Sequence, residues 1–352
     1  MKKIILFLVF ALIAFTGCNE DGREEDVDLI PPKHTQHIET DTQIIKTIYL
    51  AGGCFWGVEG YFQRVKGVVD TDTGYANGNT ETTSYQALKY TDHAETVRVD
   101  YDIAIISLEE ILLHYFSIID PVSLNKQGND SGRQYRTGVY YTDINDLPVI
   151  EKIFSYEEDI HGDLAVEKMA LKNFVKAEEY HQDYLEKNPR GYCHIDLNQA
   201  EEPLFKKEYK NPEEAQIKET LDELSYSVLR ENDTELRWSS PLNSEYRKGI
   251  YLDKITGEPL FASKDKFDSG SGWPSFSKPI LAGNVTNFED QSYGMNRIEV
   301  RSSGGDNHLG HVFTDGLEEK GGLRYCINGA ALTFIPYEEM EEEGYKEYMV
   351  LL

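Results

Sequence analysis

The apolar positions follow two different patterns along the chain, and each pattern predicts its own kind of domain. In the first half, strand-like runs alternate with longer segments in which apolar residues recur at helical spacing. In the second half, short apolar stretches lie among glycines and turns. The runs that predict strands are 47–51, 97–101, 249–252 and 331–335, and the segments with helical spacing are 108–116 and 150–160.

These patterns predict two domains. The N-terminal one is expected to be α+β, with an α/β plait-like mixed sheet and helices, and the C-terminal one to be mainly β. The turn-rich segment 73–78 and the polar, glycine-bearing segment 125–136 are predicted to be loops. Polar, proline-containing stretches separate the domains, and a short helix is expected at 213–224. The predicted parts are a leader at 1–17, an acidic disordered tether at 18–45, domains at 46–200 and 221–352, and a linker at 201–220.

Residues 1–17 have the features of a targeting segment. Lys2 and Lys3 precede an apolar run at 4–15, which is shorter than the ~20 residues that a membrane-spanning helix needs. Thr16-Gly17-Cys18 then resembles the end of a bacterial lipoprotein signal, in which Cys18 is lipidated and begins the mature chain. An ordinary secretory peptide and an uncleaved anchor are the alternatives. The lipoprotein interpretation predicts an extracytoplasmic protein anchored to a bacterial membrane, in the periplasm or on the cell surface.

Charge and cysteine content exclude several classes of function. The chain has 62 acidic and 35 basic residues and a formal net charge of −27. Because phosphates are bound by Lys and Arg, we expect neither nucleic acid nor an anionic lipid surface as a partner. Four cysteines in 352 residues do not make a disulfide scaffold, and none of them forms a CxxC pair. A thioredoxin-type motif and a zinc knuckle are therefore not expected.

Cys54 is the first candidate for chemistry. It follows Gly52 and Gly53 where a predicted strand passes into a predicted helix, with Phe55 and Trp56 as an apolar wall beside it. A helix N-terminus favours an anion, so a thiol at this place is expected to have a lowered pKa. A lone buried cysteine is more often an inert packing residue. On this segment alone both interpretations stay open.

Four blocks in the first domain together carry a family resemblance. They are GGCFWGVE at 52–59, DHAETVRVDYD at 92–102, NKQGNDSGRQYR at 125–136 and NPRGYCHI at 188–195. In this order they resemble a peptide methionine sulfoxide reductase of the A type, over about residues 46 to 200. Asp92 stands where the family usually has glycine, and we expect a small loop change there without loss of activity.

The resemblance implies a set of roles in this domain. Cys54 is the implied nucleophile, Glu95 the acid that protonates the sulfoxide oxygen, and Cys193 the thiol that condenses with the resulting sulfenic acid. A desolvated carboxyl can stay protonated near neutral pH, as this role requires. The implied substrate-binding residues are Phe55, Trp56, Tyr85, Asp130 and Tyr135. Taken singly, Glu95 reads as a solvated charge and the tyrosines as packing residues, so only the combination indicates function.

The second domain carries another set of blocks. They are KFDSGSGWPSF at 266–276, MNRIEVR at 295–301, HLGHVF at 308–313 and GLRYCIN at 322–328. They resemble a methionine sulfoxide reductase of the B type. The resemblance implies Cys326 as a second nucleophile and, around it, groups that position substrate or supply protons. The implied groups are His308, His311 and Asn328 in catalysis and Trp273, Phe313 and Arg324 in substrate binding. Two histidines three apart also suit a metal ion, but no third ligand is evident nearby.

Two departures from the B-type pattern change what is expected. Many such enzymes hold a structural zinc on two CxxC pairs, whereas this chain has Asp253, Thr256, Ser302 and Gly305 at the matching positions, so we expect no zinc and no bound cofactor. Ser271 stands where many have a resolving cysteine. Cys326 is then recycled either by an external thiol directly, which we favour, or through Cys193.

The sequence therefore predicts a bifunctional enzyme that reduces the S epimer of methionine sulfoxide in one domain and the R epimer in the other. Repair of oxidised extracytoplasmic proteins follows from the leader, and the resemblance implies a thioredoxin-like external donor. The alternative is a tethered lipoprotein whose two folds bind oxidised partners without turnover. Epimer-resolved kinetics distinguish the two.

Overall fold

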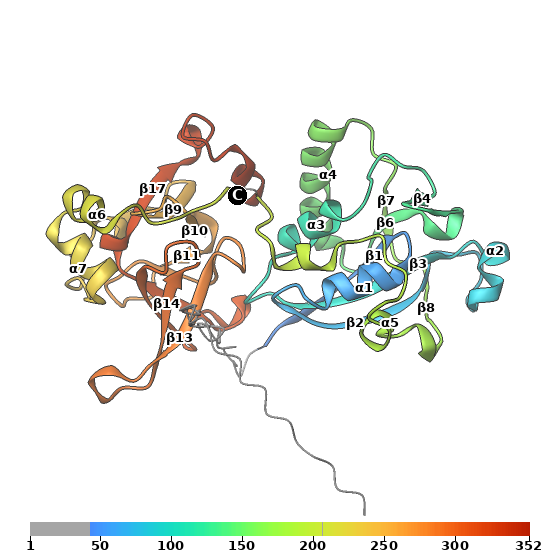
Figure 1. Cartoon of the computed structure of the whole chain (residues 1–352), viewed down its shortest axis with the longest axis horizontal. Coiled ribbons are helices and arrows are strands. Elements are labelled where there is room, and N and C mark those ends of the chain that lie inside the picture. The colour runs from blue at the N-terminus through green and yellow to red at the C-terminus, as the bar shows by residue number, and fades with distance from the viewer. Residues whose placement is uncertain (1–42, 206) are drawn as a thin grey trace, which may run out of the picture. The chain divides into compact units, whose positions relative to one another are not determined.

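The structure is a computed structural model that describes residues 43–205 and 207–352 (Figure 1). The predicted leader, Cys18 and nearly all of the predicted tether lie outside the described residues. Within the described ranges, no helix has both the length and the apolar character needed to cross a membrane.

A six-stranded mixed sheet organises the N-terminal part of the chain. Its strands lie in the order β7-β6-β1-β3-β2-β8, with β6 and β7 parallel and every other neighbouring pair antiparallel. This arrangement confirms the predicted mixed sheet. The strands are β1 (Ile45–Gly52), β2 (Val68–Ala76), β3 (Ala94–Asp102), β6 (Thr137–Tyr141), β7 (Glu167–Ala170) and β8 (Phe174–Lys176).

The helices of this part pack their apolar sides into one buried core with the sheet. Helix α1 contacts β1, β2 and β3, and α3 contacts α4. The predicted helices at 108–116 and 150–160 are confirmed as α3 and α4, and Ser107 caps α3 by accepting a hydrogen bond from the Glu110 N–H group. The helices are α1 (Phe55–Phe62), α2 (Leu88–Thr91), α3 (Leu108–Ser117), α4 (Leu147–His161) and α5 (Tyr184–Lys187).

Two predicted loops contain strands instead. Most of segment 73–78 belongs to β2, where Gly74, Tyr75 and Ala76 pair with β3 on one side and β8 on the other. The ladder hydrogen bonds of a central strand outweigh the turn propensity of its glycine. Segment 125–136 holds a short hairpin of β4 (Lys126–Gln127) and β5 (Asp130–Ser131), followed by a 3-10 turn at Arg133–Tyr135.

The predicted linker is partly structured. A 3-10 turn at Leu197–Glu201 contacts α1 and buries Ala200, so the first packed unit continues to about the start of the expected linker. The short helix expected at 213–224 is α6 (Glu214–Thr220), and a further helix, α7 (Glu223–Glu231), follows it. Asp222 separates the two because its side chain caps α7 through the Ser225 N–H group.

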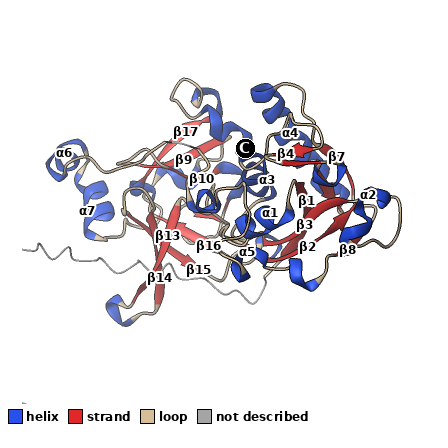
Figure 2. Cartoon of the chain, turned by 45° about the vertical axis from the view of Figure 1, so that its right-hand side comes forward, coloured by secondary structure: helices blue, strands red, loops and turns tan. Residues whose placement is uncertain are grey.

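Strands dominate the C-terminal part, as predicted (Figure 2), and they pair antiparallel. A three-stranded sheet has the order β10-β9-β17, and a six-stranded sheet has the order β11-β12-β16-β15-β14-β13. The first consists of β9 (Gly249–Asp253), β10 (Pro259–Ala262) and β17 (Leu332–Pro336). The second consists of β11 (Lys266–Phe267), β12 (Ser275–Phe276), β13 (Val285–Asp290), β14 (Arg297–Ser302), β15 (His308–Phe313) and β16 (Arg324–Ile327).

Candidate active sites

The strand-to-helix connection between β1 and α1 places Cys54 at a buried helix N-terminus. Cys54 is the N-cap residue of α1, in an extended conformation, and its side chain is 8% exposed. Gly53 makes the turn possible, because its φ of +87° lies in the left-handed region and an added Cβ would lie 2.5 Å from Gln127 Cβ. The predicted strand, glycine turn and helix are confirmed here.

Glu95 lies beside this helix terminus. It is the second residue of β3, is 2% exposed, and its Oε2 accepts a hydrogen bond of 3.2 Å from the Phe55 N–H group. Burial raises the pKa of the Glu95 carboxyl to about 8. Glu95 therefore holds its proton near neutral pH, which a proton donor to a sulfoxide oxygen has to do.

The environment of Cys54 does not lower the pKa of its thiol, so that expectation was wrong. Burial raises the pKa to about 12, and the neighbouring charge of Glu95 acts in the same direction. The N–H groups of Trp56 and Gly57 lower the pKa, as a helix N-terminus should, but burial outweighs them. The resting site thus holds a thiol next to a neutral carboxyl.

Polar side chains from separate loops surround this pair. Tyr85 and Tyr135 form a hydrogen bond with each other, and burial followed by the nearby Glu95 charge raises the pKa of both hydroxyls. Asp130, on β5, has a buried Oδ2 without a hydrogen-bond partner, and its charge raises the pKa of Glu95 and of Cys54. The structure therefore brings Cys54, Tyr85, Glu95, Asp130 and Tyr135 into one site from four different segments.

The aromatic wall is larger than the sequence predicted. The ring of Phe55 is 1% exposed, whereas Trp56 is partly exposed and stacks on Tyr184 with ring centroids 3.7 Å apart. The indole N–H group of Trp56 donates to Nδ1 of His181 over 3.1 Å. Sequence reasoning missed His181 and Tyr184. The only signal was the density of ring residues at 180–184, which does not reveal packing against a segment more than 100 residues away.

Cys193 reaches the same helix from the C-terminal side of this part. A Cβ added to Gly57 would lie 3.2 Å from Cys193 Sγ, so the sulfur packs against the first turn of the helix that Cys54 caps. Its S–H group donates to the Ile195 carbonyl over 3.1 Å, and the side chain is partly buried against the core. Cys193 is thus packed beside α1 in this structure.

The second cysteine site lies on a central strand of the C-terminal sheet. Cys326 is on β16, directly opposite His311 of β15 and Ser275 of β12. The two backbones approach closely at Gly310, where an added Cβ would lie 2.2 Å from the Cys326 carbonyl oxygen. The sheet register therefore sets the His311 and Cys326 side chains next to each other on neighbouring strands.

Arg324 supplies the positive charge in this site. Burial raises the pKa of the Cys326 thiol, and contacts with Ser271 and the Arg324 charge act to lower it. The Arg324 guanidinium makes a bidentate pair with Asp315, at 2.8 and 2.9 Å, and lies 4.5 Å from the centre of the Phe313 ring. The predicted roles of Arg324 and Phe313 near the thiol are compatible with these positions.

Each histidine of the site is held by a carboxylate. His308 Nδ1 lies 2.6 Å from Glu299 Oε1, and His311 Nε2 lies 2.8 Å from Asp290 Oδ2. Burial lowers the pKa of His311. No group of three or more metal-ligating side chains occurs in the part of the chain that the structure describes. Sequence reasoning missed the two carboxylates and Asp315, because their pairing depends on strand register and turn geometry.

Trp273 precedes β12 and Asn328 directly follows β16, and hydrogen bonds hold both side chains. The Trp273 indole N–H group donates to the Glu235 carbonyl over 3.1 Å. The Asn328 amide is 3% exposed, and both of its ends are engaged: Nδ2 donates to the Leu309 carbonyl over 3.0 Å and Oδ1 accepts from the Glu235 N–H group over 3.1 Å. In this structure the Asn328 amide links β15 to the segment that carries Glu235.

Two protein families match the chain in succession. The peptide methionine sulfoxide reductase family matches residues 46–213, and the SelR domain matches residues 221–336. The chain is a fusion of one domain from each family, the reductase domain at residues 46–213 and the SelR domain at residues 221–336. Both methionine sulfoxide reductase activities follow from this assignment. The first family extends 13 residues beyond the predicted end of its domain at residue 200.

Similar solved structures each match less than half of this chain. Mxr1 from Saccharomyces cerevisiae in reduced form is 37% identical over 46% of this chain and 93% of that chain, with a TM-score of 0.41. Methionine sulfoxide reductase A of Corynebacterium diphtheriae is 32% identical over 43% of this chain and 78% of that chain, with a TM-score of 0.40. Mxr1 in complex with Trx2 is 30% identical over 42% and 89%, with a TM-score of 0.31. The assignment of the chain to these two families rests on the family matches.

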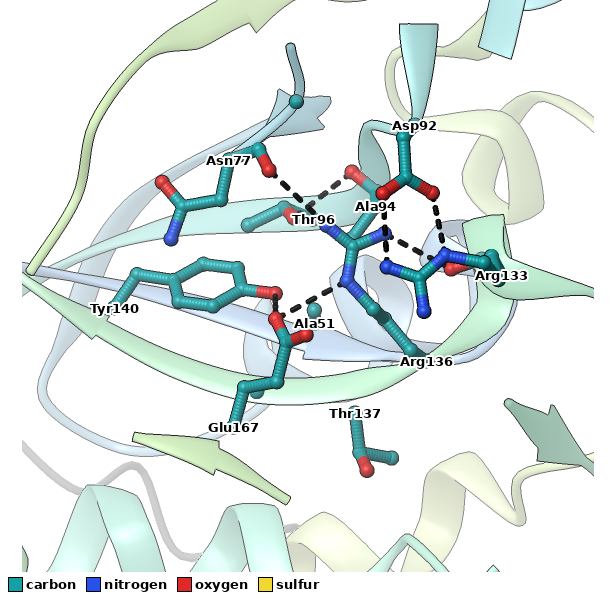
Figure 3. Close-up of polar contacts among 12 residues, drawn as sticks. Ala51, Asn77, Asp92, Ala94, Thr96, Arg133, Arg136, Thr137, Tyr140 and Glu167 are labelled. Atoms are coloured by element: carbon teal, nitrogen blue, oxygen red, sulfur yellow. Dashed lines mark hydrogen bonds and ion pairs between the residues drawn. The ribbon is translucent and has the colours of Figure 1, made fainter. Parts of the chain in front are cut away.

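Asp92, the departure in the reductase domain, closes a polar cluster (Figure 3). It adopts the left-handed conformation, with φ of +57°, which explains why glycine suits this position. Its carboxylate makes a bidentate pair with Arg133, at 2.6 and 2.8 Å. Buried Arg136 donates to the Arg133 carbonyl and to Glu167. These contacts hold the turn that carries Tyr135.

The SelR domain uses hydrogen bonds at the positions that match the zinc ligands. Asp253 Oδ1 accepts from the N–H groups of residues 255 and 256, and Oδ2 accepts from the Asn307 side chain over 2.9 Å. Ser302 Oγ accepts from the Asn307 N–H group. Thr256 and Gly305 offer no thiolate or imidazole. A donor set of one carboxylate and two hydroxyls, already hydrogen-bonded or held in this loop, does not fit a structural zinc.

Proposed function

We propose that this fusion reduces both epimers of methionine sulfoxide, the S epimer in the reductase domain and the R epimer in the SelR domain. The observation that carries the proposal is that each domain sets a thiol beside a group able to transfer a proton, Cys54 beside Glu95 and Cys326 beside His311. A purified full-length chain should convert both epimers of a peptide methionine sulfoxide. Conversion of only one epimer would contradict the proposal.

In the reductase domain, Glu95 supplies the proton that sulfoxide reduction requires. The Cys54 sulfur attacks the sulfoxide sulfur, the S–O bond breaks, and Glu95 gives its proton to the departing oxygen. The oxygen then bonds to the Cys54 sulfur as the bond between that sulfur and the substrate sulfur breaks, so Cys54 ends as a sulfenic acid and the substrate leaves as a thioether. The thiol proton replaces the one that Glu95 gave up. The hydroxyls of Tyr85 and Tyr135, which sense the Glu95 charge, are placed to donate hydrogen bonds to the same oxygen.

Cys193 completes the cycle of this domain. Its thiol attacks the Cys54 sulfenic acid, a disulfide forms, and water leaves. The position of its sulfur against Gly57, within the first turn of α1, supports this role. A thioredoxin-like dithiol then reduces the disulfide and is itself oxidised.

The SelR domain performs the same exchange with different groups. Cys326 attacks the sulfoxide sulfur, and His311, held by Asp290, takes up the thiol proton and passes it to the oxygen. Trp273 and Phe313 form the apolar surface for the methyl group, and Arg324 stabilises the thiolate. The products are methionine and a Cys326 sulfenic acid.

An external thiol is proposed to recycle Cys326 directly. Ser271 Oγ lies 3.8 Å from Cys326 Sγ, where a cysteine would be within disulfide reach, but a hydroxyl does not reduce a sulfenic acid. We therefore expect Cys193→Ser to leave R-epimer turnover unchanged with dithiothreitol and with a thioredoxin-like donor. S-epimer turnover with the protein donor should fall at least about tenfold, because the Cys54 sulfenic acid loses its resolving thiol.

The matched gain-of-function variant is Ser271→Cys, in which the introduced thiol should form a disulfide with Cys326 after R-epimer reduction. Collapse of R-epimer turnover in Cys193→Ser with the protein donor alone, together with a trapped disulfide between Cys193 and Cys326 in the parent, would show that Cys193 serves both domains.

The leader motivates a proposal about place. Lys2, Lys3, the short apolar run and Thr16-Gly17-Cys18 favour a lipid anchor on Cys18 and an extracytoplasmic repair role. Radiolabelled palmitate should enter the full-length chain in bacterial cells and should not enter Cys18→Ser. Equal labelling of both proteins would rule out this anchor.

A further inference from the structure

Glu235 is a buried carboxylate of the SelR domain that takes no part in the proposed reaction. It lies four residues after α7 and is 3% exposed. Desolvation makes such a group costly unless it is hydrogen-bonded. Its contacts all lead to the segments that form the Cys326 site, and they come from both its side chain and its backbone.

The carboxylate of Glu235 binds the backbone immediately after the nucleophile. Oε1 accepts a hydrogen bond of 2.6 Å from the Gly329 N–H group, and Oε2 accepts one of 2.9 Å from the Ala330 N–H group. These donors lie three and four residues after Cys326. Because both bonds are made to an ion with two acceptor atoms, they fix the path of the chain leaving β16 more firmly than a neutral acceptor would.

The backbone of Glu235 binds the two side chains that flank the site. Its N–H group donates to Asn328 Oδ1 over 3.1 Å, and its carbonyl accepts from the Trp273 indole over 3.1 Å. One residue therefore connects the apolar wall of the site, at Trp273, with the segment that follows Cys326. If the Glu235 side chain releases residues 329 and 330, the wall and the nucleophile lose their common support.

We propose that Glu235 is a positioning residue for the SelR reaction, which sets Cys326 and Trp273 at a fixed separation without touching the substrate. The proposal rests on the proposed R-epimer activity. A displacement of about 1 Å between a substrate pocket and a reacting group is enough to slow an enzyme about 100-fold. The role needs a side chain of this length with two acceptor atoms, because the N–H groups of two successive residues donate to it.

Two substitutions in the full-length chain test this requirement. Glu235→Gln keeps the length but turns an amide NH2 group toward one of the backbone N–H groups. Glu235→Asp keeps the charge but shortens the side chain by one methylene. Both are expected to lower kcat for the R epimer, measured with dithiothreitol and normalised to the folded fraction, by about 10- to 100-fold. The S-epimer kcat of the same molecules should stay within twofold of the parent.

Glu258→Gln is the matched control. Glu258 is another buried carboxylate of this domain, 5% exposed, and it accepts the Gly304 N–H group over 2.8 Å. Its removal should lower thermal stability but leave R-epimer kcat per folded molecule unchanged. The rate of Cys326 alkylation by iodoacetamide across pH gives a second readout, and it should change in the Glu235 variants only.

The proposal is overturned if folded Glu235→Gln and Glu235→Asp keep R-epimer kcat within twofold of the parent. It is equally overturned if Glu258→Gln loses as much, because the effect is then general destabilisation. Failure of the proposed function itself looks different, since the parent chain would then not reduce the R epimer at all.

Discussion

Cys54→Ser is expected to abolish reduction of the S epimer of methionine sulfoxide and to leave R-epimer turnover unchanged, and Cys326→Ser is expected to do the reverse. A serine hydroxyl is a much poorer nucleophile toward sulfoxide sulfur than a thiolate is. Removal of a nucleophile costs an enzyme more than about 10³-fold in kcat. The measurement is steady-state kinetics on each purified epimer of a blocked methionine sulfoxide, with dithiothreitol as reductant.

The fusion supplies its own control for this pair, because each variant retains one intact domain. The untouched activity reports that the chain is folded and that the reductant works. The double variant should be inactive toward both epimers. Loss of both activities in either single variant would mean that the two sites do not act separately.

Glu95→Gln is expected to lower S-epimer kcat by about 10²- to 10⁴-fold, the usual contribution of a general acid. Glutamine preserves the shape of Glu95 and can donate an amide hydrogen bond, but it has no proton to transfer to the sulfoxide oxygen. The R-epimer rate should not change. An S-epimer kcat within threefold of the parent would remove Glu95 from the mechanism and leave the tyrosine hydroxyls as the source of the proton.

The role of Glu95 as proton donor also predicts how the S-epimer kcat of the parent changes with pH. Burial raises the pKa of the Glu95 carboxyl to about 8, so the acid form prevails at neutral pH and is lost as pH rises through that value. The Cys54 thiol, with its pKa raised to about 12 by burial, does not titrate in this range. S-epimer kcat should therefore fall above about pH 8 in the parent, and this alkaline decline should be absent in Glu95→Gln.

The hydrophobic pattern correctly predicted several regular elements of the first domain. The strand at 47–51, the alternation at 97–101 and the helix at 108–116 are all present, as β1, β3 and α3. The pattern failed for segment 73–78, where pairing with β3 and β8 overrides a turn-rich composition. It also gave no sign that α6 and α7 are separate helices, a division made by the cap at Asp222.

The candidate nucleophiles and Glu95 could be predicted from the sequence because they lie in specific motifs. Their electrostatics were not. The helix N-terminus suggested a lowered pKa for Cys54, whereas the depth of burial, which depends on the whole fold, raises it. The carboxylates that hold the histidines were missed for a related reason: Asp290 and Glu299 reach His311 and His308 across strands whose register only the structure gives. Glu235 was missed because its partners are nearly 100 residues away.

The most direct test of the two-site account is to map the cysteines of the unmodified protein after a single turnover. One equivalent of the S or the R epimer is mixed with reduced protein without a reductant, and the products are trapped with dimedone and alkylating agent and located by mass spectrometry. The account predicts a Cys54–Cys193 disulfide after the S epimer, with Cys326 still reduced. After the R epimer it predicts a dimedone adduct on Cys326, with Cys54 and Cys193 still reduced. Oxidation of Cys54 by the R epimer, or of Cys326 by the S epimer, would contradict it.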